Sequence, residues 1–111
     1  MRRREEVRLT AEEHYRAGVL CVSSGDLEGA VSAFRQALSV DASFHMAHLG
    51  WAQVLDRKGQ VDAAIFQVRD AIALAPDEPL AHASLSRLYQ QKGMIQDAEA
   101  AMADSLKLQK G

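Results

Sequence analysis

Several features that would restrict the fold or the function are scarce in this sequence. It contains a single cysteine, Cys21, so no disulfide can form within the chain and a reducing compartment fits. Its 13 Lys and Arg residues are balanced by 15 Asp and Glu residues, without the basic excess typical of nucleic-acid-binding domains. No apolar run approaches the roughly 20 residues that span a bilayer. We therefore expect a cytoplasmic protein with no nucleic-acid partner and no membrane span.

Proline and aromatic residues are also rare. The chain has two prolines, one tryptophan, two tyrosines and three phenylalanines, whereas alanine is abundant. This composition favours helices and suits a β sandwich poorly, because β sheets are enriched in aromatic and β-branched residues. A length of 111 residues fits one domain.

The first ten residues differ from the rest of the chain. They begin with Met1 and three arginines, as the basic end of a signal peptide does, but the apolar core that must follow is missing. Acidic residues from Glu5 onward make this start locally neutral. We interpret residues 1–10 as a frayed helical lead-in. A short basic arm that touches an anionic partner is the alternative.

An internal repeat organises the remaining residues. Gly25, Gly59 and Gly93 follow one another at equal intervals along the chain. Small and apolar residues recur with the same spacing, namely Gly18, Ala52 and Ser86; Ala30, Ala64 and Ala98; Ala37, Ala71 and Ser105; Leu27, Val61 and Ile95; and Leu38, Ile72 and Leu106. So many columns in one register predict three repeats in a single domain over 11–111, with repeats at 11–44, 45–78 and 79–111.

Each repeat divides at its glycine into two amphipathic segments. Apolar residues follow one another at steps of three and four, which is the period of a helix, and glycine suits a helix end. Thr10 and Glu13 form a capping-box pattern, while Ser43 and Asp77 are predicted N-caps. The predicted helices are 11–24, 27–40, 44–58, 61–74, 78–92 and 95–109.

These residues resemble the tetratricopeptide repeat (TPR), whose 34-residue unit carries W-x2-L-G-x2-Y, then A-x3-F, then P. The corresponding residues here are His14, Ala17, Gly18, Cys21, Ala30 and Phe34 in the first repeat; His48, Trp51, Ala52, Leu55, Ala64, Val68 and Pro76 in the second; and His82, Leu85, Ser86, Tyr89, Ala98 and Met102 in the third. The resemblance covers about residues 10–110. It implies an all-α fold, a right-handed α-solenoid of three antiparallel helix pairs.

The resemblance also implies a binding surface. In similar proteins a second stripe on the first helix of each repeat lines a concave groove that holds a peptide or a partner helix. Here that stripe is mostly apolar, so we expect a non-catalytic adaptor, co-chaperone or assembly factor that binds an apolar peptide or an amphipathic helix. The expected peptide-binding residues are Tyr15, Val19, Val22, Met46, Leu49, Gln53, Leu80 and Arg87. In the alternative, Val7 and Leu9 of the lead-in fold back over Val19 and Val22.

One TPR subclass binds the C-terminal carboxylates of chaperones through Lys, Asn and Arg side chains. The matching positions here are Tyr15, Val19, Gly50, Leu80 and Ser84. None of these side chains carries the positive charge or the amide through which that subclass binds the carboxylate, so that subclass is disfavoured.

A different function class is a structural module that self-assembles through its terminal repeats. The last helix is expected to leave apolar residues partly uncovered, namely Met94, Ile95, Met102, Leu106 and Leu108. Homodimerisation through the C-terminal repeat is the corresponding hypothesis.

Candidates for catalysis, cofactor binding or metal binding are weak. His14, His48 and His82 occupy one repeat position, and adjacent helices lie about 8–10 Å apart, too far for ligands that must lie about 2 Å from one ion. Cys21 falls in a core column. No phosphate loop, dinucleotide fingerprint or zinc quartet occurs. We therefore expect no enzyme activity, no catalytic residues, no cofactor and no metal.

Overall fold

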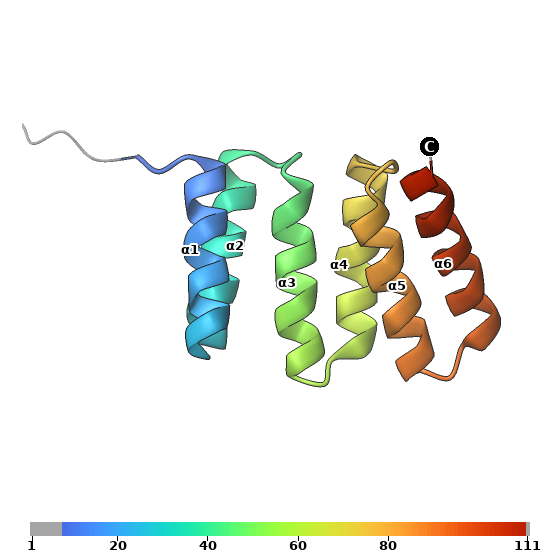
Figure 1. The fold of residues 1–111 in the computed structure, drawn as a ribbon. Helices are drawn as coiled ribbons and strands as arrows, with labels where there is room; N and C mark the ends of the chain where they lie inside the picture. Colours follow the sequence, from blue (N-terminus) through green and yellow to red (C-terminus); the bar gives the residue numbers. More distant parts are fainter. Residues whose placement is uncertain (1–7, 111) are drawn as a thin grey trace, which may run out of the picture.

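The computed structural model describes residues 8–110, and all of the regular structure in that range is helical (Figure 1). Six helices follow one another along the chain: α1 (Ala11–Ser24), α2 (Leu27–Val40), α3 (His45–Arg57), α4 (Val61–Leu74), α5 (Pro79–Gln91) and α6 (Ile95–Lys110). Their ends agree with the predicted ranges within one residue. None of these helices combines the length and the hydropathy needed to cross a bilayer.

The repeat glycines lie where the first helix of each pair ends. Gly25, Gly59 and Gly93 have φ angles of 83°, 77° and 77°, in the left-handed region that favours glycine. At Gly25 the backbone N–H donates to carbonyl groups of the last turn of α1. Each glycine therefore lets the chain reverse, so that the second helix packs antiparallel against the first.

The capping predictions are partly confirmed. Thr10 accepts from the N–H of Glu13, and the Glu13 carboxylate accepts from the N–H of Thr10, so the capping box is present. The two other predicted N-caps are wrong by one residue, because helices α3 and α5 are preceded by Phe44 and Glu78.

The hydrogen bonds at the starts of α3 and α5 differ from those of the predicted N-caps. The N–H and hydroxyl of Ser43 both donate to the Asp41 carboxylate, which lowers the pKa of that carboxyl and leaves α3 without a side-chain cap. At the start of α5, Glu78 accepts from the N–H of Leu80, and Pro79 occupies the first turn, where its missing N–H costs nothing.

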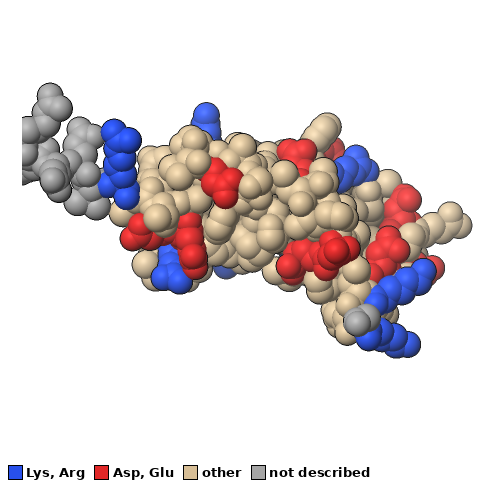
Figure 2. All heavy atoms as spheres, turned by 90° about the horizontal axis from the view of Figure 1, so that it is seen from above, with Lys and Arg blue, Asp and Glu red and all other residues tan. Residues whose placement is uncertain are grey.

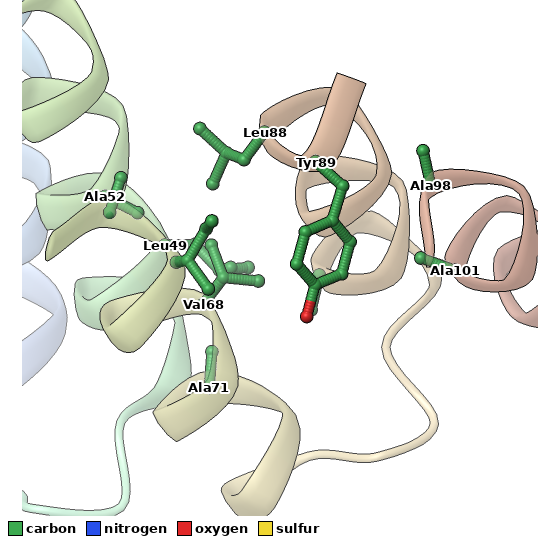
Figure 3. Packing of buried hydrophobic residues seen from close by; sticks show 11 residues of the cluster. Leu49, Ala52, Val68, Ala71, Leu88, Tyr89, Ala98 and Ala101 are labelled. Atoms are coloured by element: carbon green, nitrogen blue, oxygen red, sulfur yellow. The ribbon is translucent and has the colours of Figure 1, made fainter. Parts of the chain in front are cut away.

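The helix pairs stack on one another through two groups of buried residues. One group joins the first repeat to α3 around Phe34, and the other joins α3 to α6 around Val68 and Leu88. Figure 3 shows Leu88 and Tyr89 of α5 between residues of α3 and α4 on one side and the alanines of α6 on the other. Every alanine in the predicted small-residue columns is at most 5% exposed, as close helix packing requires.

In the third repeat, the position equivalent to Gly18 and Ala52 is occupied by a polar residue, Ser86. The hydroxyl of Ser86 is fully buried and donates to the carbonyl oxygen of Ala98 at 2.7 Å. Ser105 is equally buried and donates to the carbonyl oxygen of Pro79 at 2.9 Å. The third repeat thus keeps the small size that the packing needs and satisfies each buried hydroxyl with a backbone acceptor.

Two ion pairs connect neighbouring repeats in the same way. Lys58 pairs with Glu28, and Lys92, at the equivalent position of the next repeat, pairs with Asp62. In each pair the lysine follows the first helix of one repeat and the acid begins the second helix of the preceding repeat. The surface ion pairs therefore follow the same repeat period as the buried core residues. On the face that Figure 2 shows, acidic and basic side chains are interspersed and form no large patch of one sign.

Candidate functional site

Helices α1, α3 and α5, the first helices of the three repeats, together border a hollow. Its volume is about 210 Å³, and residues from all three helices line it: Tyr15, Val19, Met46, Leu49, Gly50, Gln53, Leu80, Ser84 and Arg87. The lining residues lie about one helical turn apart along each helix, so their side chains point to one side. The hollow depends on all three repeats and cannot exist in a single helix pair.

The apolar part of the lining differs in accessibility from residue to residue. Leu80 is 51% exposed and Val19 is 41% exposed, whereas Leu49 is only 8% exposed. Leu49 belongs to the buried group around Val68, and Met46 packs against that group. Val19 and Leu80 are therefore the apolar side chains most available to a ligand, and Leu49 supports the hollow from the core.

Two small residues line the hollow between the larger ones. Gly50 has no side chain and Ser84, its equivalent in the next repeat, has only a hydroxymethyl group. Gly50 is buried because the ring of Phe34 lies directly behind it, and a Cβ there would lie 2.6 Å from Cζ of that ring. The same ring would meet a Cβ added at Gly18, at 2.5 Å. Phe34 is thus held between α1 and α3, and the two glycines leave the space for its ring.

Tyr15 connects the hollow to the aromatic residues of the core. Its ring centroid lies 5.8 Å from that of Phe34 and 5.6 Å from that of Phe44, both in tilted geometry. Burial raises the pKa of the Tyr15 phenol above its usual value of 10.0. The phenol therefore stays neutral at physiological pH, as a hydrogen-bonding group beside an apolar surface.

The polar part of the hollow lies toward the C-terminal ends of α3 and α5. Gln53 provides an amide, and Arg87 is the one charged residue in the lining. The guanidinium of Arg87 lies 3.6 Å from the carboxylate of Asp56, and its side chain is 56% exposed. Because this pair is solvated, the arginine remains accessible to an acidic group of a ligand.

Seven of the eight sequence-predicted residues border this one hollow, and Val22 does not. Val22 is 6% exposed and belongs to the buried group that contains Phe34. Its carbonyl oxygen accepts from Arg57 of α3 at 3.3 Å. One turn beyond Val19, α1 already packs against its neighbours, so the helical period alone extended the surface one turn too far. Gly50 and Ser84 also line the hollow, but they were not predicted as groove residues because such small side chains do not indicate a contact surface in the sequence.

The fold-back alternative concerns the start of the chain. Val7 lies outside the described residues. Leu9 is 39% exposed and is not part of the lining of the hollow.

Two further hollows, which are larger and more open than the one between α1, α3 and α5, lie on α2 and α4. One, of about 470 Å³, is bordered by residues of α2 alone, among them Glu28, Ser32 and Arg35. The other, of about 380 Å³, lies at the equivalent place on α4, beside Phe66 and Arg69. Arg69 donates to the Tyr89 hydroxyl at 2.6 Å and lies 5.9 Å from the ring centroid of Tyr89. We favour the smaller hollow as a binding site because side chains from all three repeats converge there.

Two of the histidines make hydrogen bonds that hold them in place. His48 makes a 2.8 Å hydrogen bond with Gln67 of α4, and His82 makes one of 2.9 Å with the carbonyl oxygen of Pro76. Within residues 8–110, no three His, Cys, Asp or Glu side chains are grouped as a metal site would require. Cys21 is half-buried and packs against the Phe34 group.

Comparisons with known proteins agree with this geometry. The solved structures that resemble the chain include the crystal structure of MamA (23% identity, 91% of this chain and 59% of that chain, TM-score 0.85), the second TPR of Spaghetti (RPAP3) bound to the HSP90 peptide SRMEEVD (17%, 88% and 91%, 0.83) and the CopN–Scc3 complex (16%, 88% and 58%, 0.78). At these identities the likeness shows the fold alone.

The chain spans little more than half of the MamA chain. A comparison with curated protein sequences finds no match. A sequence model described as "Tetratricopeptide repeat", however, matches residues 22–88, which is more than half of the chain. The protein is therefore a member of the tetratricopeptide repeat family, in which helix pairs serve as protein-interaction modules.

Proposed function

We propose that this protein is a non-catalytic adaptor whose groove on α1, α3 and α5 binds an apolar segment of another protein. The observation that carries the proposal is the hollow of about 210 Å³, to which every repeat contributes lining residues. A groove that needs the complete stack is a surface that the repeat architecture creates and that no single helix pair can supply.

The chemistry of the lining defines the ligand. Val19 and Leu80 offer exposed aliphatic surface on either side of the small residues Gly50 and Ser84. An alkyl or aromatic side chain of a ligand would fit between them. Burying each Val or Leu gains about 1.5–3 kcal/mol, of which the loss of ligand freedom cancels a large part. Two or three such anchors supply about 3–9 kcal/mol before that loss, so we expect weak binding, no tighter than about micromolar.

The expected ligand is not a peptide that is bound through its C-terminal carboxylate. The second TPR of Spaghetti (RPAP3) is solved with an acidic peptide, SRMEEVD, and its fold supports peptide binding by this architecture. The carboxylate-binding positions of that subclass correspond here to Tyr15, Val19, Gly50, Leu80 and Ser84, which all border the hollow and carry no charge. We therefore propose an internal apolar stretch or one face of an amphipathic helix as the ligand.

A displayed library of random peptides tests this proposal. Peptides selected on the wild-type chain should be rich in Leu, Ile, Phe or Met. They should lose at least tenfold in affinity for Val19→Glu and for Leu80→Glu, because each carboxylate would have to be desolvated against an apolar ligand. Both residues are at least 41% exposed, so the variants should keep the helical circular dichroism of the wild type.

A matched control comes from the opposite face. Phe66 is 68% exposed on α4 and lies outside the groove, so Phe66→Glu should leave the affinities unchanged. Selected peptides that bind both groove variants as well as the wild type would refute the groove as the binding site. Leu49→Glu is unsuitable as a probe, because Leu49 is a core residue at 8% exposure.

A further inference from the structure

The outward face of helix α6 carries an uncovered apolar stripe. Ile95, Met102 and Leu106 are 54%, 38% and 51% exposed, and their spacing along the helix places them on one side. Glu99 lies within the same stripe. Exposed apolar residues at helical spacing are a surface that a second helix can cover.

The internal repeat shows how such a stripe is normally covered. Phe34 and Val68, the equivalents of Met102, are both 0% exposed because the first helix of the next repeat packs on them. Met102 is 38% exposed at the same position. The surface of α6 therefore has the shape of a helix-packing face of this fold, apart from the charge at Glu99.

We propose that this face binds the same face of a second copy of the chain, with the two α6 helices antiparallel about a two-fold axis. If the axis passes between Met102 and Ala103, Met102 packs against its counterpart and Leu106 lies beside Glu99 of the second copy. The small side chain of Ala103 borders this contact and allows the helices to approach closely.

Charge complementarity supports this occupant. With the axis at that position and a rise of about 1.5 Å per residue, Glu99 lies at nearly the same height as Lys107 of the second copy, about 1.5 Å apart along the helix. The symmetry produces this pair twice. Neither Glu99 nor Lys107 takes part in the ion pairs found among residues 8–110.

A head-to-tail arrangement, in which α1 of the second copy covers α6, fits less well. In that geometry Glu13 would occupy the position of Ala47 and Ala81, which are both 0% exposed. Its carboxylate accepts from the N–H of Thr10, and these hydrogen bonds lower the pKa of Glu13, so it would be buried as a charge. Arg16 would likewise take the place of Gly50 and Ser84, which are both small residues.

The dimer would carry two grooves, because the residues that line the hollow lie on α1, α3 and α5 and leave α6 free. A partner with two copies of the apolar segment would then bind with avidity. This assignment does not depend on the proposed function, since the face and the groove share no residue.

Sedimentation equilibrium of the purified chain across the micromolar range tests the proposal. The wild type should pass from 12.1 kDa to twice that mass as its concentration rises. Leu106→Lys should remain monomeric while keeping its helical circular dichroism. Glu99→Lys and Lys107→Glu should each weaken the dimer by about tenfold through two like-charge contacts, and the two changes together in one chain should restore it.

The control is Leu20→Lys on α1, where Leu20 is 70% exposed and far from α6 in the stack. This variant should dimerise like the wild type. A wild-type chain that stays monomeric throughout overturns the proposal. Assembly beyond the dimer also overturns it if Leu20→Lys abolishes that assembly, because this result would show head-to-tail contact. A double charge exchange that fails to restore the dimer overturns it as well.

Discussion

Replacing Gly50 by alanine is the most direct test of how the core supports the groove. In an exposed helix this change stabilises by about 1 kcal/mol, because alanine has the higher helix propensity. Here the added Cβ would lie 2.6, 2.7 and 3.0 Å from three atoms of the Phe34 ring. Carbon atoms normally approach to about 3.5–4.0 Å, so the ring must move by roughly 1 Å.

Phe34 has little freedom to move. Its ring is 0% exposed, lies equally close to Gly18 on α1, and contacts Tyr15. Overpacking of this kind costs about 1–3 kcal/mol, which exceeds the gain in helix propensity. We therefore expect Gly50→Ala to lower the free energy of unfolding by up to about 2 kcal/mol and the melting temperature by several degrees.

A second substitution reverses the sign of this effect. Phe34→Val introduces the residue found at the equivalent position 68, in a repeat whose equivalent of Gly50 is Ser84, a residue that does have a Cβ. In the Phe34→Val background, Gly50→Ala should stabilise by about 1 kcal/mol, because only the propensity gain remains.

Urea unfolding followed by circular dichroism measures all four chains of this cycle. If Phe34→Val unfolds too readily, Phe34→Leu replaces it. As a matched control, Ser84→Ala should change stability by less than about 1 kcal/mol, since it adds no atom. A Gly50→Ala variant that is more stable than the wild type with Phe34 present would refute the reasoning.

Three further predictions concern titration, surface charge and local stability. Because the pKa of Tyr15 is raised by burial, the contribution of Tyr15 to stability should be constant below pH about 10 and be lost as the pH rises above the unfolded pKa, so alkaline destabilisation should be smaller in Tyr15→Phe. Lys92→Met, which breaks the exposed pair with Asp62, should cost less than about 1 kcal/mol, and the loss should shrink at high salt; a larger, salt-independent loss would contradict this. Amide hydrogens of α6 should exchange faster than those of α3, which is covered on both sides, and equal rates would argue against nearest-neighbour stability.

The helices could be predicted from the sequence because the repeat supplies three copies of each signal. Gly25 alone is a weak indication of a helix end, but Gly25, Gly59 and Gly93 in one register identify the same turn three times. The burial of the alanine columns follows from the same redundancy. Seven of the groove-lining residues also follow from helical period, since positions a turn apart on the first helices share a side.

The features that the sequence could not predict depend on particular neighbours. Ser43 is a good N-cap by type, but it is bonded to Asp41, and the residue that precedes α3 is Phe44. Val22 has the right helical phase for the groove, yet it lies where α1 packs into the Phe34 group. The role of Gly50 depends on an aromatic ring of the preceding repeat, so nothing in its own repeat position predicts it.

The groove and the core are not independent in this protein. Leu49 borders the hollow while belonging to the buried group of the second and third repeats, and Tyr15 borders it while contacting Phe34 and Phe44. A ligand that covers these residues would contact side chains that are already packed in the core. Such a groove is preorganised, so binding should require little ordering of the protein. The same coupling means that loss of ligand binding on changing Leu49 or Tyr15 would report lost packing as much as lost contact, whereas changes at Val19 and Leu80 separate the two.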